Sequence, residues 1–218
     1  MKKRIVIAFA LLVLFSTYLP QKIFLINKFN IETIKVENNS IIKDKEIKKD
    51  LAYLYGTSII FLNNSKIEKI LKKKSFIESF KVKKIYPNEL KIKIFEQNPI
   101  LILKYKNKKF YLSENIDLID YFDLKKYRNL PIVFGDKKNF KILFENMKKI
   151  NFPLNMIKNY YSFESNRWDL ETYNQKIIKL PSENYTKSLN HFMNQKKETN
   201  FNKYKVFDYR IKDQLILK

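Results

Sequence analysis

The composition of this chain indicates a folded and strongly basic protein. Its 218 residues suffice for one large or two small domains, and 45% hydrophobic with 15% aromatic residues exclude disorder throughout. The absence of cysteine excludes disulfides, thiolate nucleophiles and cysteine-based metal sites. The formal net charge of +22 would suit a binder of nucleic acid, of another anionic polymer or of an anionic membrane.

Lysine, rather than arginine, supplies most of this charge. Only four of the 44 basic residues are arginine, whereas specific contacts with phosphates and bases favour the planar arginine fork. Isoleucine, asparagine, phenylalanine and tyrosine are also used heavily, as a codon bias toward A and T would produce. We therefore attribute the charge to a habit of the source genome and expect no nucleic-acid partner.

The amino terminus has the pattern of a membrane anchor. Residues 2–4 are basic and precede an uncharged apolar run at 5–19. As a helix, residues 5–26 would span roughly 33 Å, enough for the hydrocarbon core of a bilayer. A cleaved signal peptide begins in the same way, but the chain offers only a poor cleavage site at 16–20. We expect an uncleaved transmembrane anchor at 5–26, with residues 1–4 in the cytoplasm and the rest exported.

The next segments predict the order β-α-α-β-β. Alternation at 29–37 predicts a strand. Apolar residues at helical spacing predict a helix at 45–54, capped by Asp44 and ended by Gly56. A second helix is predicted at 66–74, capped by Ser65.

Two alternating runs around Tyr86-Pro87-Asn88 predict a hairpin, in which Pro87 sets φ and Asn88 tolerates a left-handed conformation. Ile85 falls out of phase with the apolar residues before it, which predicts a bulge or strand end near Lys83-Lys84. In the second run, three residues are expected on one buried face: Leu90, Ile92 and Ile94.

From Ile100 onward, short alternating segments predict a mostly antiparallel β domain with helical insertions over 99–218, with Pro99 as its boundary. The predicted strands are 100–105, 109–112, 132–134, 167–173, 176–180, 205–209 and 214–217, and the predicted helices are 138–150 and 182–195. The expected fold class is α+β: a single N-terminal transmembrane helix, a β-α-α-β-β domain over 29–98 and this β domain.

The chain offers no recognisable catalytic chemistry. Gly56 and Gly135 are the only glycines, so no phosphate-binding glycine loop can be built. The single histidine, His191, is expected to be solvated, and Trp168 is expected to pack in a β core. We expect no catalytic residue, no metal site and no cofactor.

The order of these segments resembles the bacterial cell-division FtsQ family (the DivIB group), in which a POTRA domain precedes a β domain. The resemblance covers nearly the whole chain and includes the segments 29–39 and 130–135. At single residues it is carried by Gly56, Tyr86, Pro87, Glu96, Pro99, Arg167, Trp168, Asp208 and Arg210.

The resemblance implies a non-enzymatic divisome scaffold that links early and late cell-division proteins at the septum. It implies a single-pass protein of the inner membrane with its bulk in the periplasm, FtsB-like and FtsL-like partners, and no small-molecule substrate. In the family, FtsB adds a strand to the edge of the β domain. Carried onto this chain, that edge comprises Tyr209, Gln214, Leu215, Ile216 and Leu217, and Ile216→Pro is predicted to weaken partner binding in a folded domain.

Three other functions stay open from the residues alone. A POTRA-bearing accessory of outer-membrane assembly or secretion would need a carboxy-terminal domain of many ten-residue strands, which fits 99–218 poorly. A membrane-anchored binder of an anionic polymer would explain the net charge of +22. An anchored hydrolase would need a catalytic site that the sequence does not offer.

Overall fold

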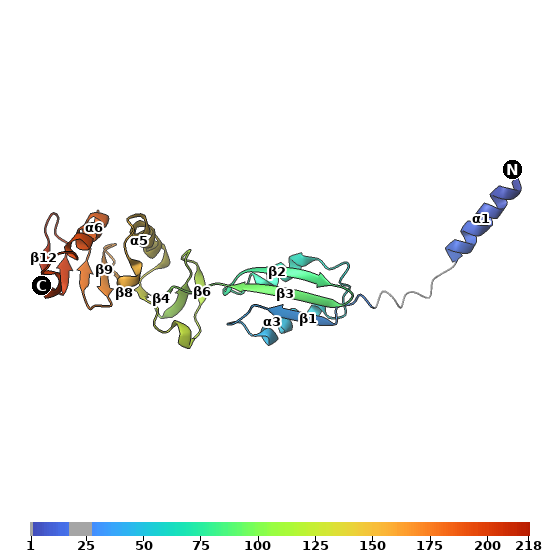
Figure 1. Cartoon of the computed structure of the whole chain (residues 1–218), viewed down its shortest axis with the longest axis horizontal. Helices are drawn as coiled ribbons and strands as arrows, with labels where there is room; N and C mark the ends of the chain where they lie inside the picture. Colours follow the sequence, from blue (N-terminus) through green and yellow to red (C-terminus); the bar gives the residue numbers. More distant parts are fainter. Residues whose placement is uncertain (1, 18–27) are drawn as a thin grey trace. The chain divides into compact units, whose positions relative to one another are not determined.

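The computed structural model describes residues 2–17 and 28–218, which form an N-terminal helix and two compact units that divide between Glu96 and Gln97 (Figure 1). The helix α1 (Lys2–Thr17) exposes every side chain from residue 3 to residue 16. Among residues 2–17 and 28–218, none of the helices combines the length and the hydropathy that a membrane span requires. The predicted anchor at 5–26 continues into residues 18–26, which lie outside the described residues.

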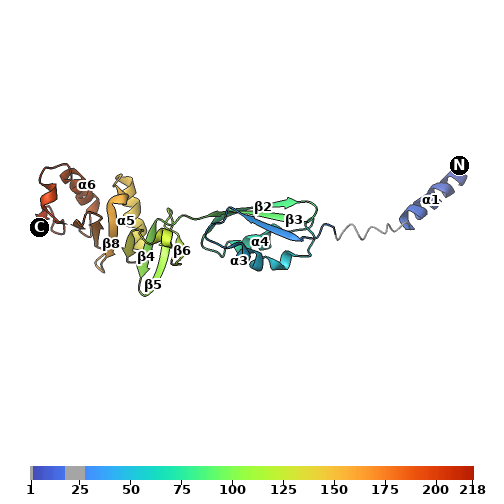
Figure 2. The ribbon, with the colours of Figure 1, turned by 60° about the horizontal axis from the view of Figure 1, so that its bottom comes forward.

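The first unit is a three-stranded sheet with its helices on one face (Figure 2). The central strand β3 (Glu89–Glu96) pairs in parallel with β1 (Thr33–Glu37) and antiparallel with β2 (Ile77–Ile85). The predicted order β-α-α-β-β is confirmed. The helical segments are α3 (Asp44–Asp50), the 3₁₀ turn η1 (Ala52–Leu54) and α4 (Asn64–Leu71).

Both helices of this unit begin earlier than predicted. Asp44 is the first residue of α3 rather than its cap, and its carboxylate accepts a hydrogen bond of 2.6 Å from the Asn39 amide. Asn63, not Ser65, caps α4, because its side-chain oxygen accepts from the Ser65 N–H at 2.9 Å. Gly56 does follow the helical segment, with a φ of +76° that only glycine adopts readily.

The hairpin is confirmed. Of the two alternatives predicted near Lys83-Lys84, the bulge is wrong, whereas the strand does end directly after them, at Ile85. Pairing of β2 with β3 is continuous from Ser79 to Ile85, and the only register shift between them lies between Ile77 and Ser79. Lys84 stands opposite the buried Leu90, and its ammonium donates to the carbonyls of the 60–62 loop, at 3.2 Å to Ile60 and at 3.2 Å to Leu62. A lysine thus occupies the inward position, which puts Ile85 on the other face. The turn contains a cis Tyr86–Pro87 bond, and Asn88 keeps a negative φ.

The three residues predicted on the inner face of the second run are buried: Leu90, Ile92 and Ile94.

The second unit is one nine-stranded sheet with the order β12-β11-β10-β9-β8-β7-β4-β5-β6. Five neighbouring pairs are antiparallel and three are parallel, namely β4 with β7, β7 with β8, and β10 with β11. The strands are β4 (Leu101–Tyr105), β5 (Lys108–Leu112), β6 (Leu118–Asp120), β7 (Ile132–Phe134), β8 (Ile157–Ser162), β9 (Trp168–Thr172), β10 (Ile177–Lys179), β11 (Val206–Asp208) and β12 (Ile216–Leu217).

The helical insertions of this unit are confirmed at α5 (Lys137–Lys149) and α6 (Tyr185–Gln195). Three short 3₁₀ turns add to them: η2 (Lys125–Tyr127), η3 (Leu154–Met156) and η4 (Phe201–Lys203). The whole chain is therefore a mixed α+β protein.

Two strands of this sheet escaped prediction. β6 has only three residues, too few for alternation to show. In β8 a register shift between Ile157 and Asn159 breaks the alternation, so its buried residues, Ile157 and Tyr160, are three apart.

Both helices of the second unit pack on the same face of its sheet. Paired positions on β8, β9, β10 and β11 bury one row of side chains: Tyr160, Leu170, Ile178 and Phe207. Phe140 of α5 meets Tyr160 at 5.2 Å between ring centroids, and Phe192 of α6 meets Phe207 at 5.0 Å. Trp168 is 4% exposed and packs edge-on against Phe140, as predicted for a core aromatic.

Candidate functional site

Among residues 28–218, the strand β12 forms one edge of the nine-stranded sheet and pairs only with β11. Val206 and Lys218 exchange two backbone hydrogen bonds, of 2.9 Å from the Val206 N–H and 3.1 Å from the Lys218 N–H. Because such pairs alternate along an antiparallel ladder, the next bonded pair is Asp208 with Ile216. The N–H and C=O of Leu217 therefore point away from β11, toward the open edge.

The side chains of this edge divide between the two faces of the sheet. Leu215 and Leu217 are half-buried and pack against the core. Ile216, between them, is 37% exposed on the opposite face. The strand is thus attached through its leucines, while its outer backbone groups and the Ile216 side chain stay available.

An aromatic cluster packs against β11 on the buried face of the sheet. The ring of Phe207 lies 5.0 Å from Phe192 and 5.1 Å from Phe201. The buried Lys176 ammonium donates to the carbonyls of Phe201, at 3.0 Å, and Tyr204, at 2.7 Å, and lies over the Phe201 ring. Burial lowers the pKa of Lys176. These contacts fix the segment that leads into β11.

A charged pair follows directly on β11. The Arg210 guanidinium donates to both oxygens of Asp208, at 2.8 Å from Nε and 2.6 Å from Nη2. These hydrogen bonds hold the pKa of Asp208 below its ordinary value and raise the pKa of Arg210. Asp208 pairs with Lys179 on β10, and Lys179 pairs with Asp169 on β9, so charges of alternating sign cross the sheet. Burial raises the pKa of Asp169.

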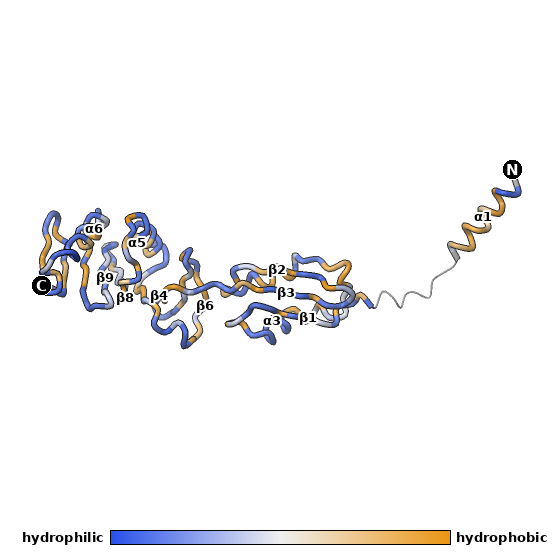
Figure 3. The backbone as a smooth tube through the Cα atoms, viewed as in Figure 1, coloured by the Kyte–Doolittle hydropathy of each residue, from blue (hydrophilic) through white to orange (hydrophobic). Residues whose placement is uncertain are grey.

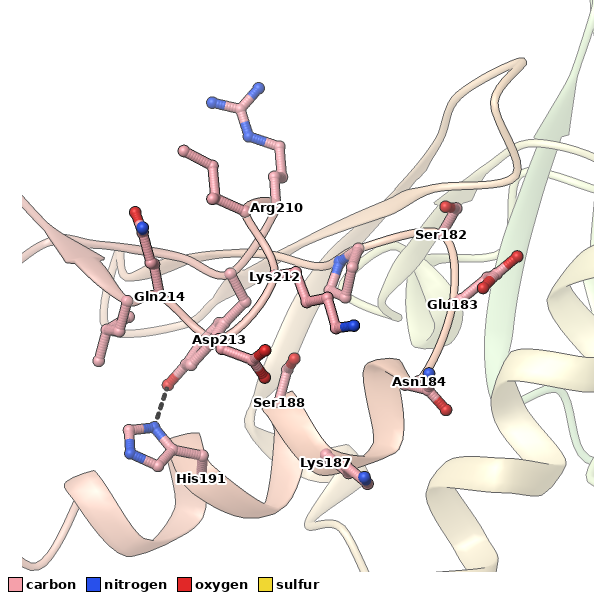
Figure 4. Close-up of a pocket in the computed structure, with 14 residues that line it drawn as sticks. Ser182, Glu183, Asn184, Lys187, Ser188, His191, Arg210, Lys212, Asp213 and Gln214 are labelled. Carbon is pink, nitrogen blue, oxygen red and sulfur yellow. Dashed lines mark hydrogen bonds between the residues drawn. The ribbon is translucent and has the colours of Figure 1, made fainter.

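A groove of about 630 Å³ adjoins the edge, between residues 181–191 and residues 209–215 (Figure 4). Tyr209 forms part of its lining and is 7% exposed, its hydroxyl 3.2 Å from His191 Nδ1. Burial raises the pKa of Tyr209. The Tyr209 N–H donates to the Lys179 carbonyl at 2.9 Å, so this residue contributes the side of the groove rather than the free backbone edge.

The structure brings the predicted partner-binding residues together. Gln214 and Leu215 line the groove next to Tyr209, and Ile216 with Leu217 continues from them as β12. Sequence reasoning missed His191 and Ile211, which also line the groove. Nothing in the sequence around His191 signals this position, because α6 is separated from β12 by some twenty residues of chain.

The other predicted motif residues have local structural surroundings. Glu96, at the end of β3, accepts backbone N–H groups from Ser40, Ile41 and Ile42 at 2.8–3.0 Å and the Ser40 hydroxyl at 2.6 Å. Burial would raise the pKa of Glu96, but these donors outweigh it and hold the pKa below 4.5.

Further motif residues support the turns and the core. Tyr86 packs edge-on against Phe29 at 6.3 Å, and Pro87 follows it in the exposed hairpin turn. Pro99 is buried. The Arg167 guanidinium lies 4.3 Å from the centre of the Phe163 ring, beside Trp168.

The first unit matches a known family. Residues 29–97 fit the family model described as POTRA domain, FtsQ-type. The chain carries a POTRA domain of the FtsQ type. The predicted resemblance to the FtsQ family is thereby confirmed.

Relatives extend this likeness beyond the POTRA domain. Cell division protein FtsQ of Rickettsia bellii (strain RML369-C) is 27% identical over 190 residues, which cover 85% of this chain and 71% of the relative. The FtsQ of Rickettsia prowazekii (strain Madrid E) is 29% identical over 188 residues, 84% of this chain and 69% of the relative. The FtsQ of Agrobacterium fabrum (strain C58 / ATCC 33970) is 23% identical over 163 residues, 74% of this chain and 51% of the relative.

Proposed function

We propose that this chain is a non-enzymatic scaffold of the bacterial divisome that links early and late cell-division proteins at the septum. The FtsQ-type POTRA domain and relatives named cell division protein FtsQ, aligned over most of the chain, support the assignment to cell division.

The proposed topology is a single pass through the inner membrane. Residues 5–26 would anchor the chain, residues 1–4 would be cytoplasmic, and the POTRA domain (29–98) and the β domain (99–218) would be periplasmic. Figure 3 shows that α1 is hydrophobic over most of its length. Its large apolar side chains are exposed, which supports this arrangement because water is a poor environment for them.

The proposed mode of action is strand addition. An FtsB-like protein would pair with the outer side of β12, and an FtsL-like protein would complete the complex. The observation that carries this proposal is the open edge of β12, at which the backbone groups of Leu217 point away from the sheet. The adjoining groove would take side chains of the added segment.

Two measurements test the proposal. Depletion of the protein in its host should give filamentous cells, because septation would stall, and restoring the full chain should restore division. The full chain in detergent should also bind the periplasmic segment of an FtsB-like protein in calorimetry. Normal division on depletion would remove the cell-division role, whereas filamentation without calorimetric binding would remove only the strand-addition mode.

A further inference from the structure

Apolar side chains gather at one end of the POTRA domain, where the chain enters it. Three segments adjoin there, and we call them the aromatic tip: residues 28–30, the loop 55–62 and the turn 86–88. The Ile59 N–H donates to the Phe29 carbonyl at 2.8 Å, and the ring of Phe29 meets that of Tyr86 at 6.3 Å. The exposed large hydrophobic side chains of the tip are Tyr55, Ile60, Phe61 and Tyr86.

Phe61 is the most exposed of these large hydrophobic residues. Its side chain is 85% exposed, the highest value among the exposed large hydrophobic residues of the described chain. The loop that carries it is held in place, because the Lys84 ammonium donates to the carbonyls on either side, those of Ile60 and Leu62. A fixed backbone that presents a phenylalanine to solvent indicates a contact surface.

The charge beside the loop 55–62 is positive, whereas at the turn 86–88 the Glu32 carboxylate accepts a hydrogen bond of 2.6 Å from the Asn88 amide. Residues 51–67 contain no aspartate or glutamate. Lys66 and Lys69 of α4 line a shallow hollow of about 470 Å³ together with Phe61, and the Lys66 ammonium lies 4.8 Å from the centre of the Tyr53 ring. Protein surfaces that bind the headgroups of an anionic membrane typically combine lysines with exposed aromatic residues.

The proposed anchor ends close in sequence to this end of the domain. Only Asn27 separates residue 26 from Lys28, the first residue of the tip. At the opposite end of the domain, the Glu96 carboxylate accepts hydrogen bonds from the loop after β1. That end lies one length of β3, roughly 25 Å, from the aromatic tip. An anchor at 5–26 would therefore keep the aromatic tip, rather than the opposite end, close to the bilayer.

We propose that the aromatic tip docks on the surface of the anionic bilayer that holds the anchor. Phe61 enters the boundary between headgroups and acyl chains, while Lys66 and Lys69 contact anionic headgroups. The docking orients the POTRA domain relative to the membrane. This inference rests on the proposed anchoring of residues 5–26.

Quenching by brominated lipids in nanodiscs tests the contact with the full chain. Phe61→Trp places a reporter at the tip, and Lys45→Trp places a matched reporter at an exposed position of the opposite end. The natural Trp168 is 4% exposed and gives the same background in both. In phosphatidylglycerol nanodiscs with bromines high on the acyl chains, the Phe61→Trp chain should lose emission, and the Lys45→Trp chain should keep it.

Charge removal supplies a second arm. In the Phe61→Trp chain, Lys66→Ala or Lys69→Ala should each lower the ratio of docked to undocked protein by about fivefold, given what one lysine contributes at an anionic surface. Replacing phosphatidylglycerol by phosphatidylcholine should also reduce the quenching, because the anionic headgroups are then absent.

The outcomes separate docking from anchoring. If the chain does not co-purify with nanodiscs, the anchoring fails and the docking fails with it. If the chain is held in nanodiscs but both reporters are equally quenched, or neither is, docking is overturned and anchoring stands. A blue-shifted but unquenched reporter at position 61 would show that a protein surface covers the tip, which also overturns the bilayer as its occupant.

Discussion

Glu96 joins two parts of the POTRA domain through a single carboxylate. It ends β3 and accepts three consecutive backbone N–H groups of the loop after β1, from Ser40, Ile41 and Ile42. These residues precede α3, which begins at Asp44. Glu96 therefore connects β3 to the loop after β1 at the end of the domain from which the chain continues into the β domain.

Glu96→Gln should loosen this loop, because a neutral amide oxygen accepts more weakly than a carboxylate. We expect local opening to become easier by about 1.5 kcal/mol, the lower end for hydrogen bonds to a charged group. Hydrogen exchange of the amides at 40–42 in the full chain measures the effect. Glu78→Gln, on the exposed side of β2, is the matched control and should leave exchange unchanged. Equal exchange in both variants would contradict the role of Glu96.

The same contact predicts a pH dependence with a definite sign. The pKa of Glu96 is lower in the folded chain than its ordinary value of 4.5, so the unfolded chain takes up the proton first as pH falls. The stabilisation is complete above the unfolded pKa and is lost as pH falls through the lower folded value. The amides at 40–42 should therefore exchange slowly at pH 6. At acid pH their exchange should accelerate beyond the intrinsic pH trend, and only in the natural chain. A Glu96→Gln chain with the same acid response would contradict this assignment.

Gly135 is required both by its φ of +158°, which L side chains rarely adopt, and by the space around it. A Cβ at this position would lie 2.6 Å from Ser162 Cβ and 3.4 Å from the Trp168 ring. Gly135→Ala should therefore lower the free energy of unfolding of the β domain by about 1–3 kcal/mol, as overpacking does. Adding Ser162→Gly removes the clashing atom and should restore part of the loss, measured by denaturant unfolding of the full chain. If the second change does not help, the backbone strain at the φ of +158° dominates over the clash with Ser162.

At the scale of elements, alternation predicted most strands because each has one face on a core. Prediction from alternation failed where an inward-facing side chain is polar or where the register of the strand shifts. Lys84 occupies an inward position of β2 because its ammonium has carbonyl partners in the 60–62 loop, and no pattern of apolar residues signals that. β8 was missed because its register shift breaks the period of two. The start of α4 was misplaced by two residues because Asn63 and Ser65 are equally good caps by residue type.

The candidate edge was predicted as a set of residues, but the direction of each backbone group needed the structure. Ile216 was predicted to be the donor for a partner strand, yet its N–H faces β11, because the bonded pair is Ile216 with Asp208. Leu217 is the residue whose N–H points outward. Proline at 216 would therefore damage the β11–β12 ladder itself, and proline at 217 is the sharper test.

Leu217→Pro should weaken binding of an FtsB-like segment by about 2- to 12-fold, the value of one hydrogen bond. Leu217→Ala is the control, since it loses the same side-chain packing but keeps the N–H. Calorimetry with the full chain gives the affinities, and hydrogen exchange of Val206 and Lys218 checks that β12 stays paired. If the alanine and proline variants bind equally, the partner does not use the Leu217 N–H.

At the scale of the whole molecule, the order β-α-α-β-β of the first unit followed from the sequence, whereas the order of strands in the large sheet did not. β10 and β11 are parallel neighbours although α6 and η4 lie between them in the chain. That crossover is fixed by packing of Phe192 and Phe201 against Phe207, which joins residues distant in sequence. Local periodicity carries no signal of such contacts.

Despite the net charge of +22, the described residues leave few arginines free for specific contacts with nucleic acid. Three of the four arginines are engaged within the protein: Arg128 donates to Asp123, Arg210 donates to Asp208, and Arg167 lies over the Phe163 ring with Asp169 nearby. The lysines that remain are point charges that bind phosphates without selecting a sequence. Any affinity for duplex DNA should therefore come from counterion release alone.

The full chain should bind duplex DNA weakly at low salt, with no preference for sequence, and should release it at about 150 mM salt, because counterion release loses its driving force as salt rises. Fluorescence anisotropy with two unrelated duplexes over a salt series measures this, and Asp123→Asn, which frees Arg128, should raise only the salt-sensitive affinity. Tight binding that persists at physiological salt, or a clear difference in affinity between the two duplexes, would favour an anionic-polymer binder over the division scaffold. Loss of binding to both duplexes together is the result that the engaged arginines predict.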